Sequence, residues 1–135
     1  MKQQGTDYRI AESGADYSKC HSFIRYNHFQ DPPITFPTIM AERKGKLVGV
    51  LGTHKSNKAI IAGPLIINTP GNNAFVGVRL IEGYEKVLAT LKVKTYVAAM
   101  WKHQPDWIRM ASDVGFEPLA VENGVVWMKR TLSHA

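Results

Sequence analysis

The stretch IINTPGNNAFVGVRLIEGYEKVLATL, residues 66–91, decides the fold of this 135-residue chain. It opens on the end of an apolar run, passes through a segment rich in Pro, Gly and Asn, and continues with apolar residues at helical spacing. That order predicts a buried strand, a loop and then a helix. A helix that starts directly after a strand offers unpaired N–H groups and a positive dipole end to the loop before it. The stretch is therefore a candidate anion-binding site.

The helix predicted in the second half of this stretch has a distinct apolar face. The residues on or beside that face are Val76, Leu80, Ile81, Tyr84, Val87, Leu88 and Leu91. Asn72 or Asn73 is suited to cap its N-terminus. These features alone are equally compatible with a capped helix that packs on a core and binds nothing.

The residues before the stretch predict a strand, a helix and an antiparallel meander. A short strand is expected at 8–12, and Ser13 with Asp16 forms a capping pair for the following helix. Three prolines in residues 27–37 exclude a continuing helix and predict a loop. Three strands follow, separated by turn-like residues, at 38–43, 46–54 and 58–68.

The residues after the stretch predict a strand at 94–101 and a short helix at 103–115. Pro105 suits the first turn of that helix and Gly115 its end. Asn123-Gly124 between two apolar runs is a strong signal for a final β-hairpin. The predicted order is β–α–β–β–β–α–β–α–β–β in a single domain over residues 1–135.

Composition limits the kinds of protein this can be. No apolar run approaches the about 20 residues needed to cross a bilayer, and the N-terminus has no apolar signal segment. Cys20 is the single cysteine, so we expect a packed thiol in a reducing, cytoplasmic setting. The five histidines lack metal-ligand spacing, and we predict no metal site.

The formal net charge of +6 and a pI near 9.6 leave anionic partners open. Basic residues gather at the two turns of the predicted meander, at Arg43, Lys44, Lys46, Lys55 and Lys58. No aromatic residues interleave with them, as a single-strand binding platform would require. We therefore interpret this segment as a solvated hairpin and do not expect nucleic acid as a partner.

The order of elements resembles the GNAT superfamily of acetyl-CoA-dependent N-acyltransferases over nearly the whole chain. The strand-loop-helix unit at 58–91, the segment DVGFEP at 113–118 and the final Asn-Gly hairpin carry the resemblance. Two phrases, KLVGVLGTH and GPLIINTPGNNAFVGVRLIEGYEKVL, are also similar to small acetyltransferase-like proteins of bacteriophages. The resemblance implies an α/β (α+β) fold: a twisted, mostly antiparallel sheet of about seven strands with helices on both faces.

The resemblance also implies a site for acetyl-CoA as co-substrate. In this family the fourth strand bulges and splays from the fifth, and the pantetheine arm enters the gap; Gly63-Pro64 is consistent with such a bulge. The residues implied at the cofactor are Leu65, Ile66, Ile67, Asn72, Asn73, Ala74, Phe75, Val76, Gly77 and Arg79. Gly77 alone matches the family's glycine pattern, and we expect Gly77→Asp to fold normally but to repel a diphosphate.

Few residues can be identified as candidates for catalysis. The position that corresponds to the family's acidic tyrosine is Ala111, and the strand IIAGPLII carries no carboxylate. His103, after the fifth strand, is the remaining candidate acid or base. His28 and Asp31 lie in the Pro-rich loop, which in this fold would border the amine acceptor.

Two functions follow from these observations. One is acetyl transfer to a primary amine of a small molecule or protein, by a monomer or homodimer. The alternative is a GNAT-fold binding or virion-associated module, in a phage, that has lost its chemistry.

Overall fold

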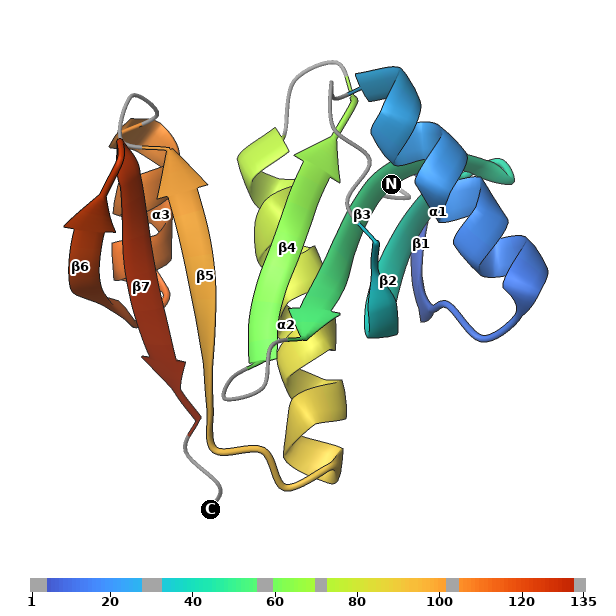
Figure 1. Cartoon of the computed structure of the whole chain (residues 1–135). Helices are drawn as coiled ribbons and strands as arrows, with labels where there is room; N and C mark the ends of the chain where they lie inside the picture. Colours follow the sequence, from blue (N-terminus) through green and yellow to red (C-terminus); the bar gives the residue numbers. More distant parts are fainter. Residues whose placement is uncertain (1–4, 28–32, 56–59, 70–72, 102–104, 133–135) are drawn as a thin grey trace.

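The computed structural model describes residues 5–27, 33–55, 60–69, 73–101 and 105–132. The described residues form seven strands and three helices, which follow one another in the predicted order (Figure 1). The strands are β1 (Thr6–Ile10), β2 (Thr35–Arg43), β3 (Lys46–Lys55), β4 (Ile60–Ile67), β5 (Thr95–Trp101), β6 (Phe116–Glu122) and β7 (Val125–Thr131). The helices are α1 (Gly14–Asn27), α2 (Asn73–Thr90) and α3 (Pro105–Asp113).

All seven strands form one sheet in the order β1-β2-β3-β4-β5-β7-β6. Neighbouring strands are antiparallel except for β4 and β5, which are parallel because α2 crosses between them. The predicted meander of β2, β3 and β4 is confirmed. The predicted Asn-Gly hairpin is confirmed as well, since Asn123 and Gly124 both have the positive φ angles that a tight hairpin turn requires.

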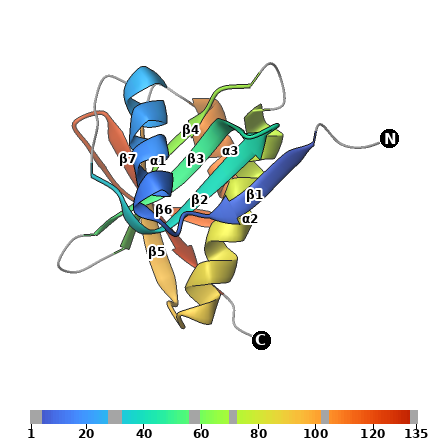
Figure 2. The same ribbon diagram turned by 90° about the vertical axis from the view of Figure 1, so that its right-hand side faces the viewer.

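Helices cover both faces of the sheet, as Figure 2 shows for α1 and α2. We call the two sides the α1 face and the α2/α3 face. Cys20 and Ile24 of α1 pack on Met40 and Val50 on the α1 face. The larger cluster, on the α2/α3 face, is built from both other helices and six strands, β2 to β7. The sheet has a core on each face because the side chains along a strand alternate between the two faces.

The predicted apolar face of α2 is largely confirmed. Val76, Leu80, Tyr84 and Leu88 are completely buried. The prediction was wrong for Leu91, which lies one residue beyond the end of the helix and is half exposed. Apolar residues at helical spacing do not show where a helix ends. Here the chain has left the helix at Leu91, so this side chain is not held against the core.

Cys20 is fully buried in the core beneath α1, as predicted for a packed thiol. Burial raises the pKa of this thiol to about 11. Because the thiolate is the reactive form, Cys20 has neither the access nor the ionisation state of a nucleophile near neutral pH.

A cluster of ion pairs fastens the start of α1 to the sheet. Ser13 and Asp16 exchange the backbone–side-chain hydrogen bonds of the predicted capping pair. Asp16 also accepts two hydrogen bonds from Arg9, which in turn reaches Glu42 on β2 at 3.0 Å. Lys19 completes the cluster with a 2.7 Å contact to Glu42. Arg9 therefore links β1, α1 and β2.

This cluster predicts a loss of stability in acid. Hydrogen bonds from Arg9 hold the pKa of Asp16 far below its usual range, and Lys19 with Arg9 lowers the pKa of Glu42. A carboxyl whose pKa is depressed by folding stabilises the protein above its unfolded pKa of about 4, and that contribution disappears as the pH falls through the folded pKa. We expect the urea midpoint to fall between about pH 5 and pH 2.

Arg9→Gln should flatten that pH dependence, because it removes the shared cation. Arg109→Gln is the matched control, since its pair with Asp106 is 3.5 Å long and highly exposed on both sides. Equal pH dependence of urea midpoints in the Arg9 variant and the parent would contradict this account.

A second polar link lies on the opposite face and joins α2 to the far half of the sheet. Glu85 of α2 receives a 2.6 Å hydrogen bond from the Tyr96 hydroxyl of β5. It also accepts two hydrogen bonds from Arg130 of β7, at 2.9 and 3.2 Å. All three groups are largely shielded from solvent, so this bridge is more than a surface ion pair.

Candidate functional site

The sheet is interrupted between β4 and β5. Their parallel pairing consists of two residue pairs, Ile61 with Val97 and Ala62 with Ala98. Beyond Ala62 the register between β3 and β4 shifts by one residue, and Gly63 at this point has a φ of 147°, a value that side-chain-bearing residues rarely adopt. The bulge expected at Gly63-Pro64 is thus present. From there to their C-terminal ends the two strands diverge, as Figure 1 shows.

The divergence leaves one edge of β4 without a partner strand. Asn68 donates its N–H to Val48 at 2.8 Å, so this residue pair is a hydrogen-bonded one. Hydrogen-bonded and non-hydrogen-bonded pairs alternate along antiparallel strands. Ile66, opposite Val50, therefore uses its backbone groups towards β3, whereas Leu65 and Ile67 direct theirs towards β5.

Leu65 and Ile67 are consequently the residues that can offer a backbone donor and acceptor to a ligand in the gap. No strand in the described part of the chain pairs with them on that side. The inclusion of Ile66 among the expected contacts was wrong in this respect. Its backbone belongs to the β3 ladder, and its side chain is buried under α1.

Helix α2 starts at the same end of β4. Its first described residue is Asn73, and the N–H groups of Asn73, Ala74 and Phe75 lie in the first turn, where an α-helix has no acceptors of its own. Asn72, predicted as a cap, lies outside the described residues. Val76, also predicted at the cofactor, has its side chain completely buried in the core. The first turn of α2 thus adds a second row of donors, which have no acceptor within the helix, beside the edge of β4.

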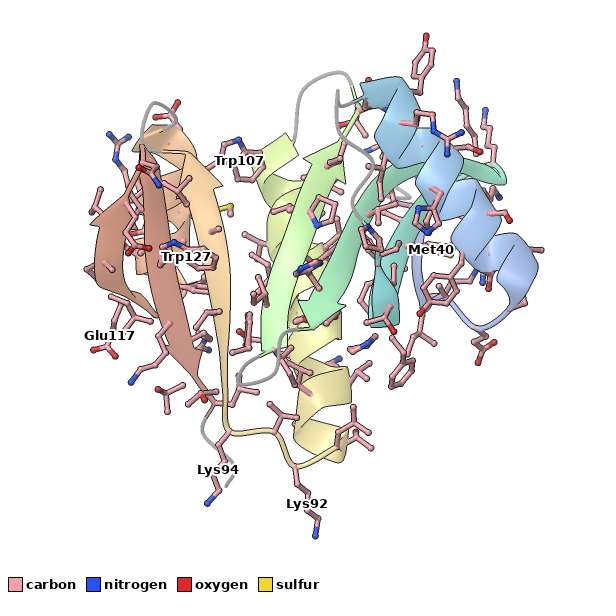
Figure 3. The ribbon with its side chains drawn as sticks, in the orientation of Figure 1. Met40, Lys92, Lys94, Trp107, Glu117 and Trp127 are labelled. Atoms are coloured by element: carbon pink, nitrogen blue, oxygen red, sulfur yellow. The ribbon has the colours of Figure 1, made fainter. Side chains whose placement is uncertain are left out.

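Gly77 does not serve the purpose that its place in the loop pattern indicated. A side-chain carbon at this position would lie 3.2 Å from Cζ3 of Trp107 and 3.4 Å from Cδ1 of Ile67. The side of Gly77 without a side chain therefore faces α3 and β4, and an indole occupies that space. Figure 3 shows Trp107 extending from α3 towards the start of α2. Nothing in the local sequence pattern indicated that Trp107 closes this corner.

Arg79 has partners on its own helix. Its guanidinium lies 5.3 Å from the centre of the Phe75 ring and 3.4 Å from the Glu82 carboxylate. Phe75 is about half exposed. Both residues thus lie at the surface one turn apart, where a cation and an aromatic ring remain accessible to an anionic ligand.

The rim of the site is set by a contact between α1 and β4. Asn68, directly after β4, donates a side-chain hydrogen bond to Asn27 at the end of α1, at 2.9 Å. Asn27 itself is anchored by a 2.8 Å bond to the Phe23 carbonyl. His28 and Asp31 follow Asn27 in the sequence but lie outside the described residues. His103, between β5 and α3, lies outside them too, so these three assignments stay predictions.

Neither of the nearby core positions supplies an acid. Ala111, at the place of the family's tyrosine, is completely buried. Tyr84 is buried as well, and its pKa is raised to about 12 by that burial. The Thr53 hydroxyl donates its single proton to the Pro37 carbonyl, so Tyr84 must donate to Thr53 across their 2.7 Å contact. Its proton is committed to the core.

Two further observations limit the chemistry. Within the ranges that the structure describes, no three His, Cys, Asp or Glu side chains gather as a metal site would require. No described helix is long and apolar enough to span a membrane.

The sheet order, the split between β4 and β5 and the helix that follows β4 together define the fold of the GNAT acetyltransferases. Solved acetyltransferase structures confirm this fold. No protein-family model matches the sequence, and no curated protein is similar to it in sequence.

Three of the similar structures are an acetyltransferase from Streptococcus agalactiae, the ribosomal-protein-S18-alanine N-acetyltransferase from Escherichia coli and the N-acetylglutamate synthase from Neisseria gonorrhoeae. The first has a TM-score of 0.74 at 13% identity and covers 96% of this chain and 100% of its own. The second has 0.74 at 13%, with 96% of each chain covered. The third has 0.71 at 15% and covers 98% of this chain and 36% of its own; it was solved with coenzyme A and N-acetyl-glutamate.

Proposed function

We propose that this protein is an acetyl-CoA-dependent N-acyltransferase that acts on a primary amine of a small molecule or a protein. The observation that carries the proposal is the backbone edge of β4 at Leu65 and Ile67, which pairs with no described strand and ends next to the first turn of α2, whose N–H groups have no acceptor within the helix. One row can pair with the amides of a pantetheine arm, and the other can receive a diphosphate. The residues present therefore fit acetyl-CoA.

Bound in this way, acetyl-CoA would supply the acetyl group as a thioester. Leu65 and Ile67 hold the arm along β4, and the first turn of α2 holds the phosphates. Arg79, paired with Glu82 at the surface, adds a positive charge near that turn. The main contribution of the chain is to align amine and thioester, which can account for a large part of the rate. His103 is the proposed group that accepts a proton from the amine or returns one to the sulfur.

Acetyl-CoA should stabilise the folded protein if the proposal is correct. A ligand at about 100 times its dissociation constant, with no affinity for the unfolded chain, adds about 2.7 kcal/mol. For a protein of this size the unfolding midpoint should rise by several degrees, measured by differential scanning calorimetry. Desulfo-coenzyme A, which keeps the arm and the phosphates, should produce a similar shift. An unchanged midpoint at millimolar acetyl-CoA, together with no heat of binding in titration calorimetry, would rule out a cofactor site.

A second candidate is a GNAT-fold binding module, for instance one associated with a virion, that keeps the scaffold without the chemistry. The buried alanine at position 111 favours it, because no acid stands at that place. Binding of acetyl-CoA without turnover of any amine would support this candidate. A cytoplasmic setting, a monomeric or homodimeric state and an origin in a phage stay predictions from the sequence.

A further inference from the structure

The α1 face of the sheet is uneven. Helix α1 covers the half formed by β2 and β3, whereas none of the described helices covers β5, β7 and β6 on that side (Figure 1). Met128 of β7 and Ala98 of β5 point into the core on the opposite, α2/α3 face. Their neighbours in sequence, Trp127 and Ala99, must therefore point to the uncovered side.

Trp127 is a large side chain on this open surface. It lies directly opposite Ala99 on β5 and directly opposite Ala120 on β6. Both alanines are exposed, and Trp127 is partly exposed. An indole between two methyl groups on adjacent strands forms a flat apolar shelf, which we call the Trp127 shelf. Figure 3 shows Trp127 on β7 beside β5.

The shelf lies at the divergence of the sheet. Ala98 makes the last pair with β4, so Ala99 is the first residue of β5 beyond that pairing. Trp127 is one strand further, at the usual interstrand spacing of about 5 Å. An amine that lies over Ala99, at the β5 side of the gap, would therefore place a group two or three bonds away against the indole.

The charges around the shelf do not favour an acceptor that carries a second cationic amine. Lys129 follows Trp127 on the same face, opposite Glu117 of β6, so these two charges offset each other. Glu122 is further out, beside the hairpin turn. Since these charges leave little net charge among the described residues of this surface, apolar contact and ring stacking are the main attractions that the shelf can offer.

We propose that Trp127 is a specificity-determining residue, and that the Trp127 shelf selects acceptors whose primary amine carries a flat apolar group, such as an aromatic ring, two or three bonds away. The inference rests on the proposed acetyl transfer, whose acceptor it narrows. Stacking of the acceptor ring on the indole supplies the preference.

The test compares 2-phenylethylamine, n-butylamine and 1,4-diaminobutane as acceptors at saturating acetyl-CoA. For the parent protein, kcat/KM should be about tenfold higher for 2-phenylethylamine than for n-butylamine. Trp127→Ala should bring that ratio close to one, and Trp127→Phe should restore most of it. Val121→Thr, on the opposite face of β6, is the control and should keep the parent ratio. A ratio that survives in Trp127→Ala, or a preference for the diamine, would overturn the proposal.

A binding measurement separates this proposal from the transfer reaction. The indole N–H signal of Trp127 in a ¹⁵N-labelled sample, assigned from its loss in Trp127→Phe, should shift with 2-phenylethylamine and not with n-butylamine. A shift without any turnover keeps the shelf and rejects the transferase. Turnover of all three amines at similar efficiency, with no shift, keeps the transferase and rejects the shelf. Neither a shift nor turnover rejects both.

Discussion

Gly77→Asp should lower the free energy of unfolding by roughly 3 kcal/mol or more, as measured by urea denaturation. The new carboxylate would be placed between the Trp107 ring and Ile67. Its Cβ alone would lie 3.2 Å from Cζ3 of Trp107 and 3.4 Å from Cδ1 of Ile67. A charged group there loses its hydration, and these two apolar side chains give it no hydrogen bond in return. Sequence reasoning predicted normal folding for this variant, and the position of Trp107 reverses that expectation.

Two variants separate burial of charge from loss of glycine as the cause. Gly77→Ala adds a single methyl group that meets the edge of the indole, while helix propensity improves by up to about 1 kcal/mol, so a small net change is expected. Gly83→Asp, on the same helix, faces only a methyl group of Ile39 at 3.5 Å and is partly exposed, so its cost should be much smaller. Similar losses of stability for Gly77→Asp and Gly83→Asp would show that position 77 is not enclosed as described.

Ile67→Pro should weaken acetyl-CoA binding on the order of 10-fold to 100-fold while the sheet stays folded. Proline removes the N–H that points into the gap, and that N–H takes no part in the ladder with β3. A pantetheine carbonyl would then remain unpaired in the bound state. The dissociation constant from titration calorimetry is the measurement.

Two controls accompany this variant. Ile67→Ala removes the same core contacts but keeps the N–H, so it should bind acetyl-CoA more tightly than the proline variant. Ile66→Pro removes an N–H of the β3 ladder and should destabilise the fold before any effect on binding is seen. If the proline and alanine variants at position 67 bind acetyl-CoA equally, the backbone of β4 does not hold the cofactor.

The order of elements could be predicted because each one has a local signal. The turn at Asn123-Gly124, the proline at the start of α3 and the Ser13–Asp16 cap act within a few residues of where they stand. The resemblance to the GNAT fold was based on this order, and the solved structures confirm the fold. Local chemistry of turns and caps was therefore sufficient for the order of elements, whereas their arrangement in one sheet came from the resemblance.

The details of the candidate site depend on contacts between distant residues, which the sequence could not show. Gly77 appeared to face a ligand, but its neighbour is Trp107, from another helix. The sequence does not distinguish between Leu65, Ile66 and Ile67. The hydrogen bond between Asn68 and Val48 fixes which of them direct their backbone groups into the gap. Strand register and helix packing decide both points, and neither is encoded within a window of a few residues.

The divergence of β4 from β5 also has a mechanical meaning. Two residue pairs are the strand pairing that the described residues provide between the β1–β4 part and the β5–β7–β6 part of the sheet. Helix α2 packs on the first part, and Glu85 on that helix accepts hydrogen bonds from Tyr96 and Arg130 of the second. This carboxylate therefore braces the two parts of the sheet against each other. The angle between β4 and β5 is stabilised from outside the site, by a group that need never touch a ligand.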